Sequence, residues 1–220
     1  QLSSTKNNII IKKHSALHLT DVYNPETFDI INVDPPYGEI HSYSDFSEHF
    51  LWIIHYVLNR MGFKNIVDYP AERNEEVIVA RKNVNAYFRK MEIFLKQCYS
   101  ILKQNGVLAI WFNHRNPEVW RKLIQTIRRA GFYIHQIVPL VSEHPTRIIA
   151  KGKSKINRIL VIFCKKAQMS GDIQDKINEF LELLINAKIM PEEKIARQEI
   201  DFYKSIVMYA YKANDQITKA

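Results

Sequence analysis

The residues best suited to do chemistry are Asp34-Pro35-Pro36-Tyr37, which directly follow an apolar run at 28–33. They combine a carboxylate, two rigid residues without a backbone N–H, and an aromatic ring. Ligands of open α/β sheets bind beyond the carboxyl ends of the strands. We therefore expect these four residues to form a site with hydrogen-bond acceptors and a flat ring but no donors.

A site of this kind suits a planar molecule that carries an exocyclic NH₂ group. The Asp34 carboxylate and the Pro35 carbonyl can each accept one N–H, which draws the nitrogen out of conjugation and leaves its lone pair more available. The Tyr37 ring can stack on the base, which stabilises binding by about 1–3 kcal/mol. The simpler alternative for Asp34 is the end of a strand before a proline turn.

Four further residues are candidates for the same crevice. Asn113 and His114 follow the apolar run 106–112, so they either face the substrate or form a turn that caps the next helix. Tyr43 and Phe46 follow the first motif and either line the base pocket or, for Phe46, belong to the core side of a helix.

A basic segment near the end of the sheet provides a second type of candidate. Lys151 and Lys153, with Lys155 and Arg158, surround Gly152. Such a loop either holds phosphates, which would position a nucleic acid without reading its sequence, or is a solvated hairpin tip. We expect Arg128-Arg129 and Lys165-Lys166 to be solvated ends.

Alternating apolar runs predict the elements that position these residues. Strands are expected at 9–13, 28–33, 106–112, 132–141 and 156–165, the last two as an antiparallel hairpin. Helices are expected at 45–60, 84–104, 117–130, 172–188 and 191–212. The order predicts an α/β fold with a mixed, mostly parallel sheet and C-terminal helices. The tryptophans Trp52, Trp111 and Trp120 are expected in the core.

The 220 residues predict one domain at 1–168 and a helical appendage at 169–220, with a functional or plain surface loop at 62–83. Charge is uneven: residues 1–50 hold three Lys/Arg against seven acids, and 101–166 hold thirteen against two. This basic part suggests a polyanionic partner, with nucleic acid first. Two distant cysteines, no metal-ligand spacing, no signal peptide and no long apolar span predict a cytoplasmic protein without a metal or a membrane.

The motif and the segments that follow it resemble the S-adenosylmethionine-dependent amino-methyltransferases. These segments are Asp34 to Gly38, Tyr43 to Phe46, Ser100 to Gly106 and Val107 to His114, with Glu118 to Trp120, Ala130 to Phe132, Pro139 to Glu143 and Ile159 to Lys165. Together they are similar to the adenine-specific DNA methylases of the DUF1156 type over roughly residues 9–166. The resemblance implies a Rossmann-like seven-stranded mixed sheet, a flipped base at Asp34–Tyr37 and direct methyl transfer to its amino nitrogen.

The same resemblance defines where the methyl donor would bind. The family uses a Gly-rich loop after its first strand, whereas the six glycines of this chain are scattered and form no such loop. The first strand found in this sequence corresponds to the third strand of the family, so the two strands that the resemblance implies before it are also missing. We therefore expect an N-terminal segment or a second chain to supply that loop, with Ser15, Ala16 and Asp34 completing the donor site.

Three functions remain open on the sequence. The first is methylation of a nucleobase amino group, with adenine N6 in DNA as the expected target. The second is an RNA enzyme that methylates guanine N2, because the same motif occurs in that setting. The third is a non-catalytic, methyltransferase-like subunit that binds nucleic acid or a partner, which the absent Gly-rich loop favours for the isolated chain.

Overall fold

The structure is a computed structural model that describes residues 9–12, 14–36, 43–62, 84–141, 158–167, 171–187 and 195–215. For residues 43–47 it describes the backbone alone. The predicted loop at 62–83, the basic loop at 151–155 and Tyr37 therefore lie outside the described residues, apart from Gly62.

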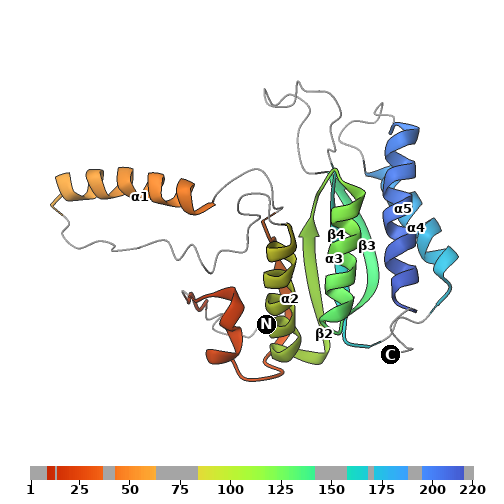
Figure 1. Ribbon diagram of the computed structural model, residues 1–220, viewed down its shortest axis with the longest axis horizontal. Coiled ribbons are helices and arrows are strands. Elements are labelled where there is room, and N and C mark those ends of the chain that lie inside the picture. Colours follow the sequence, from red (N-terminus) through yellow and green to blue (C-terminus); the bar gives the residue numbers. More distant parts are fainter. Residues whose placement is uncertain are drawn as a thin grey trace, which may run out of the picture.

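A four-stranded sheet forms the centre of the fold (Figure 1). Its strands are β1 (Phe28–Val33), β2 (Leu102–Phe112), β3 (Tyr133–Val141) and β4 (Arg158–Lys165), in the order β1-β2-β4-β3. β1 and β2 run parallel, while β4 is antiparallel to both of its neighbours. The predicted mixed α/β sheet with an antiparallel pair of last strands is confirmed. The prediction that it is mostly parallel is wrong for the described strands, because β4 lies between β2 and β3 and pairs antiparallel with both, which leaves one parallel pairing of three.

Helices precede, join and follow these strands. They are the 3-10 helix η1 (Ala16–Asp21) and the α-helices α1 (Tyr43–Arg60), α2 (Val84–Ile101), α3 (Pro117–Arg129), α4 (Ile173–Asn186) and α5 (Arg197–Ala213). The five helices expected from the sequence are all present. α5 begins later than the expected residue 191, because Ala196 has an extended backbone with ψ of 140° and no helix can run through it.

Two predictions for the elements before and between β1 and β2 are wrong. Residues 9–12 form no strand, and the side chains of Ile9 to Ile11 are exposed. The helix expected to reach residue 104 ends at Ile101, because Leu102 already pairs with Phe28 across a register shift. Gly106 allows that close approach: a Cβ there would lie 2.7 Å from Leu102 Cδ1 and 3.0 Å from the Asp29 carbonyl oxygen.

One hydrophobic core joins the sheet to its helices. Alternate residues of the central strands, such as Ile110 and Phe112 of β2 and Ile162 of β4, belong to it. Apolar faces of α2, α3, α4 and α5 complete it, and Trp120 on α3 is 1% exposed, as predicted. α3 begins with the Asn116 side chain accepting from the Glu118 N–H at 2.9 Å and ends at Gly131, whose φ of +98° favours glycine.

Buried cations fasten the last helices to this core, which overturns the expectation that they are solvated. Arg128 is 4% exposed and donates to the carbonyls of Phe132, Ala213 and Asn214, because α5 ends against the guanidinium. Arg158 is 2% exposed and pairs with Glu199 at 2.6 Å, since it begins β4 beneath α5.

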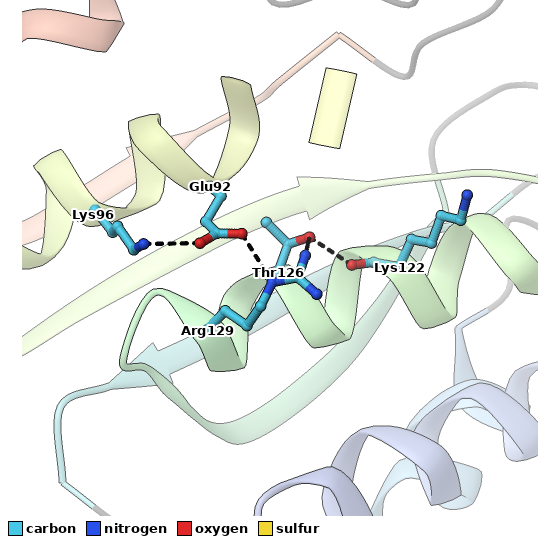
Figure 2. A network of polar contacts seen from close by, with 5 residues as sticks. All are labelled: Glu92, Lys96, Lys122, Thr126 and Arg129. Atoms are coloured by element: carbon cyan, nitrogen blue, oxygen red, sulfur yellow. Dashed lines mark hydrogen bonds and ion pairs between the residues drawn. The ribbon is translucent and has the colours of Figure 1, made fainter. Parts of the chain in front are cut away.

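Two further residues of the same expectation differ from each other. Lys166 is buried and therefore not a solvated end, with its ammonium 4.7 Å from the ring centre of Tyr99 and 3.9 Å from a Glu26 carboxylate oxygen. Arg129 is exposed, as predicted, and pairs with Glu92 of α2 at 2.8 Å. The Glu92–Arg129 pair joins α2 to α3, while Lys96 supports Glu92 from within α2 and Thr126 contacts Lys122 and Arg129 within α3 (Figure 2).

Candidate active site

The parallel pairing of β1 with β2 brings two candidate segments to one edge of the sheet. The register places Val33 beside Ile110. Asp34 directly follows the end of β1, and Asn113 directly follows the end of β2. The carboxyl ends of the only parallel pair among the described strands therefore form a shared corner, which is where open α/β sheets bind ligands.

The three residues Asp34 to Pro36 differ in their exposure within this corner. Asp34 is exposed, Pro35 is buried and Pro36 is half-buried. The phenol of Tyr87, near the start of α2, donates to the Pro36 carbonyl at 2.8 Å. This bond holds the rigid dipeptide against α2 and leaves the Asp34 side chain on the solvent side of the corner.

Asn113 contributes the most informative atom of the corner. Its side-chain Oδ1 is buried and has no hydrogen-bond partner among the described residues. A buried acceptor without a donor carries a free-energy cost of about 1–3 kcal/mol. Such an atom fits a role in which a ligand N–H completes it, and Asn113 is one of the residues that the sequence predicted for the substrate.

A hydrogen bond braces the two strand ends just below the corner. The Trp111 indole N–H donates to the Asn32 side-chain Oδ1 at 2.7 Å. Both side chains lie on the sheet face opposite the core, since their neighbours Ile31 and Ile110 pack into it. Trp111 is half-buried, so its predicted place in the core is wrong: the indole needed a polar partner, which the outer face supplies.

His114 is held by the turn that leads into α3. Its Nδ1 accepts from the Asn116 backbone N–H at 3.0 Å, and its carbonyl accepts from the Trp120 indole at 2.7 Å. Its ring lies nearly parallel to that of Phe112, at an interplanar angle of 21°. These contacts agree with the helix-capping alternative, and they fix the ring at the same strand end as Asn113.

The residues expected to bind the donor lie on a different element. Ser15 is half-buried and caps η1, accepting from the Leu17 N–H at 3.3 Å, and Ala16 is the exposed first residue of that helix. η1 is fastened to α2 where Thr20 donates twice to the Gln97 side chain, at 2.9 and 2.8 Å. Gln97 and Tyr87 are ten residues apart, or about 15 Å along the helix.

The remaining candidates fall where the structure describes no side chain. Tyr43 and Phe46 lie in the first turns of α1, and only their backbone is described. Tyr37, Lys151 and Lys153 lie outside the described residues. The structure therefore brings together Asp34, Pro35, Pro36, Asn113 and His114, and places Ser15 and Ala16 on η1.

Sequence reasoning missed Tyr87 as a functional residue. It fitted the apolar spacing of the helix and was assigned to the core, where 1% exposure indeed places it. The signal that could have revealed it is the hydroxyl, because a buried tyrosine needs a hydrogen-bond partner. A carbonyl of a Pro-Pro segment offers one.

The described residues define two other features of the molecule. None of their helices has both the length and the apolar character needed to cross a membrane. Within the same ranges, no three His, Cys, Asp or Glu side chains gather as a metal site. The corner after β1 and β2 itself offers the acceptor oxygens of Asp34, Pro35 and Asn113, which are suited to binding and orienting N–H groups.

Known proteins resemble this chain only distantly. No protein-family model and no curated protein matches it, so the DUF1156-type resemblance finds no support there. Solved structures that resemble it include the PvuII DNA methyltransferase, described as cytosine-N4-specific, at 16% identity and a TM-score of 0.43 over 84% of this chain.

Two further solved structures belong to the same set. One is a protein from Thermus thermophilus assigned as a DNA modification methylase, at 10% identity and a TM-score of 0.40 over 75% of this chain. The other is the M1.HpyAVI–SAM complex, at 11% identity and a TM-score of 0.36 over 96% of this chain and 100% of its own. The chain spans 56% of the Thermus protein and 58% of the PvuII enzyme.

Proposed function

We propose that this protein methylates an exocyclic amino group of a nucleobase, with S-adenosylmethionine as the donor and adenine N6 in DNA as the target. The observation that carries the proposal is the buried Asn113 Oδ1, without a partner among the described residues, at the strand end next to Asp34-Pro35-Pro36. The choice of adenine and of DNA rests on the sequence resemblance of the motif.

The corner acts by localising the lone pair of the amine. An NH₂ group that donates one N–H to the Asp34 carboxylate and one to the Pro35 carbonyl turns its lone pair away from the ring. The Asn113 side-chain oxygen can stabilise positive charge that develops on the nitrogen. The amine held in this way would face the methyl group that a bound donor supplies, and it would release one proton to water.

The residues present fit the methyl donor in part. S-adenosylmethionine supplies an electrophilic methyl carbon on a positively charged sulfur. The acceptor oxygens of Asp34 and Asn113 complement positive charge, and the Ser15 hydroxyl can still donate its proton while it caps η1. Ser15, Ala16 and Asp34 are thus the proposed donor-binding residues of this chain. A Gly-rich segment from a second chain, or from an N-terminal part, would complete the site.

The other candidate residues receive proposed roles on their chemistry. Tyr37 would stack on the extruded base, and Tyr43 and Phe46 would line its pocket. Lys151 and Lys153 would contact phosphates of the nucleic acid. A DNA substrate and two buried free cysteines fit a cytoplasmic protein.

A methylation assay tests the proposal. The protein as its gene encodes it is incubated with methyl-labelled S-adenosylmethionine and either duplex DNA or transfer RNA, and the nucleosides are separated after digestion. Label in N6-methyl-2′-deoxyadenosine from DNA is the expected result. Label in N2-methylguanosine from RNA would support the alternative RNA function, and label in N4-methyl-2′-deoxycytidine from DNA would keep the chemistry but overturn the base.

A second candidate function is a non-catalytic subunit that binds nucleic acid or a catalytic partner. The absence of a Gly-rich loop from the sequence favours it. Titration calorimetry of the protein with S-adenosylmethionine separates the two functions. No binding at millimolar donor, together with tight DNA binding, would support the subunit and contradict the enzyme.

A further inference from the structure

α1 presents an apolar surface that extends around most of the helix. Six large apolar side chains of its described part, and Met61 directly after its end, are 41% to 71% exposed: Phe50, Trp52, Ile53, Ile54, Tyr56, Val57 and Met61. Figure 1 shows the helix projecting away from the sheet and the other helices. A helix with apolar residues on so much of its surface is normally buried. The surface therefore calls for a partner.

The spacing of these residues selects another helix as that partner. Phe50, Ile53, Ile54, Val57 and Met61 are separated by three, one, three and four positions, which places them along one stripe. A stripe with this spacing packs against a helix that carries a similar stripe. Tyr56 flanks the stripe on one side, whereas Trp52, whose ring stacks on that of Tyr56 at an interplanar angle of 16°, lies on the far side of the helix.

The stripe is complementary to itself when two copies lie antiparallel. If the two helices cross midway between Ile54 and Val57, each Ile54 meets a Val57. Each Phe50 then meets a Met61, a pair that gains from the attraction between sulfur and an aromatic ring. Each large residue faces a large one at the ends and each branched residue faces a branched one at the centre, as a two-fold interface requires.

The area of the surface reaches the lower bound for a specific dimer. An aromatic side chain buries about 150–250 Å² and an aliphatic one somewhat less, so the exposed fractions of the stripe and Tyr56 add to roughly 500 Å². A specific interface buries at least about 1,000 Å² in total, or about 500 Å² on each partner. We propose that a second copy of this chain covers α1 by pairing its own α1 against it, antiparallel and across a two-fold axis.

A membrane surface is a poorer occupant. Helices that lie on membranes carry lysines and arginines on the face opposite the apolar one. Between residues 48 and 61 the sequence has one such residue, Arg60, and its guanidinium lies 5.4 Å from the ring centre of Tyr56 beside the apolar stripe. The dimer does not depend on methyl transfer, so a failure of either proposal leaves the other standing.

Sedimentation equilibrium of the whole protein tests the dimer. The wild type is expected to be dimeric at micromolar concentration. Ile54→Glu or Val57→Glu places buried carboxylates at the centre of the interface, so the dissociation constant should rise at least about tenfold. Ile93→Glu is the matched control: Ile93 is 48% exposed on α2, outside the stripe, and its replacement should leave dimerisation within about twofold.

Disulfide trapping gives a second test that does not rely on a destabilising substitution. The native cysteines are both buried, so they do not compete. An oxidised mixture of Ile54→Cys protein and Val57→Cys protein should yield more covalent dimer than either protein alone, and Ile93→Cys protein should yield little. A monomer at all concentrations, a dimer that Ile54→Glu leaves intact, or binding of the monomer to lipid vesicles through α1 would each overturn the proposal.

Discussion

At the scale of single residues, the site depends on which oxygens have donors and which lack them. Tyr87 satisfies the Pro36 carbonyl, and Trp111 satisfies the Asn32 side chain. Asn113 Oδ1 is buried without a partner among the described residues. An acceptor left in this way costs stability in the free protein, so its presence at a strand end indicates a functional role.

Replacing Asn113 should therefore separate stability from function. In Asn113→Ala the buried acceptor is removed, so the free energy of unfolding should stay within about 0.5 kcal/mol of wild type or rise by about 1 kcal/mol. The rate of methyl transfer should fall at least tenfold, because positive charge developing on the amine loses one stabilising oxygen. Urea unfolding and single-turnover methylation measure the two effects. A variant that is less stable by 2 kcal/mol and fully active would contradict this role.

Tyr87 should act through Pro36 rather than on substrate. Tyr87→Phe keeps the buried ring and removes one hydrogen bond, so stability should fall by about 1 kcal/mol. The freed dipeptide should position the amine less well, which lowers the methylation rate more than it changes DNA affinity. Tyr99→Phe is a suitable control, because that half-buried ring packs against Phe132, away from the corner. Equal loss of activity in both variants would show a merely structural effect.

At the scale of the elements, polar side chains decide how the helices sit on the sheet. Arg128 receives the end of α5, and Asn214 pairs with β3 by donating to the Ile134 carbonyl at 2.8 Å and accepting its N–H at 3.0 Å. The Arg129–Glu92 pair joins α3 to α2 nearer the surface. Neighbouring arginines on one helix therefore have different energetic roles.

The two arginines provide a matched pair of variants. Arg128→Met leaves three buried carbonyls without their charged donor, so the free energy of unfolding should fall by about 3–5 kcal/mol. Arg129→Met removes a half-exposed ion pair and should cost less than about 1 kcal/mol. Chemical denaturation of both variants measures the difference. Equal effects would show that burial of the Arg128 guanidinium contributes no more than a surface pair.

Glu92 should give the contact between α2 and α3 a defined pH dependence. The hydrogen bond from Lys96, and then that from Arg129, lower the pKa of the Glu92 carboxyl from 4.5, against the effect of desolvation. A lowered folded-state pKa contributes stability above the ordinary value and loses it as the pH falls. Glu92→Gln should therefore be less stable than wild type at neutral pH by up to about 1 kcal/mol.

The acid side of the profile provides the internal control. As the pH falls through the lowered pKa, the wild-type carboxyl becomes neutral and resembles the glutamine, so the two unfolding curves should converge. Denaturation at neutral pH and at about pH 3 tests this. A stability difference that stays constant over that range would mean that charge does not produce it.

At the scale of the whole molecule, the C-terminal helices share one core with the sheet. Tyr203, Val207 and Tyr211 of α5 belong to the same buried cluster as Ile110 of β2. Cys98 on α2 and Cys164 on β4 lie in it as well, and both are free and buried. The core thus spans both the helical layer and the sheet.

The two thiols should report the unfolding of this core. Burial raises the pKa of the Cys98 thiol to about 12 and also raises that of Cys164, so both stay protonated and unreactive at neutral pH. Alkylation should modify both at one slow rate, that of global opening. Because the folded pKa values exceed the ordinary 9.0, stability should fall as the pH rises above about 9. Rapid alkylation of Cys98 alone would contradict a shared core.

The sequence predicted the strand at 28–33, the three long helices that follow it and the final antiparallel pair, because apolar periodicity and turn residues mark them. The predicted strands also placed Asp34 and Asn113 at the same edge of the sheet. It could not predict that Arg128 and Arg158 are buried, since their partners lie on α5, far along the chain. The three exposed isoleucines at 9–11 read as a strand, yet no described strand pairs with them.

Trp52 shows the same limit at a larger scale. Its apolar neighbours predicted a core position, yet 71% of the residue is exposed. Periodicity shows that a face is apolar but not what covers it, and a second molecule does not enter a pattern within one chain.

The most direct test of the central claim is the rate of methyl transfer by Asp34→Ala. The protein as its gene encodes it is mixed with labelled S-adenosylmethionine and a saturating DNA duplex in a single turnover. Loss of one preorganised contact to the reacting amine should slow transfer at least about 100-fold, while the affinity for DNA changes less than threefold. Transfer within threefold of the wild-type rate would show that the corner after β1 does not hold the amine.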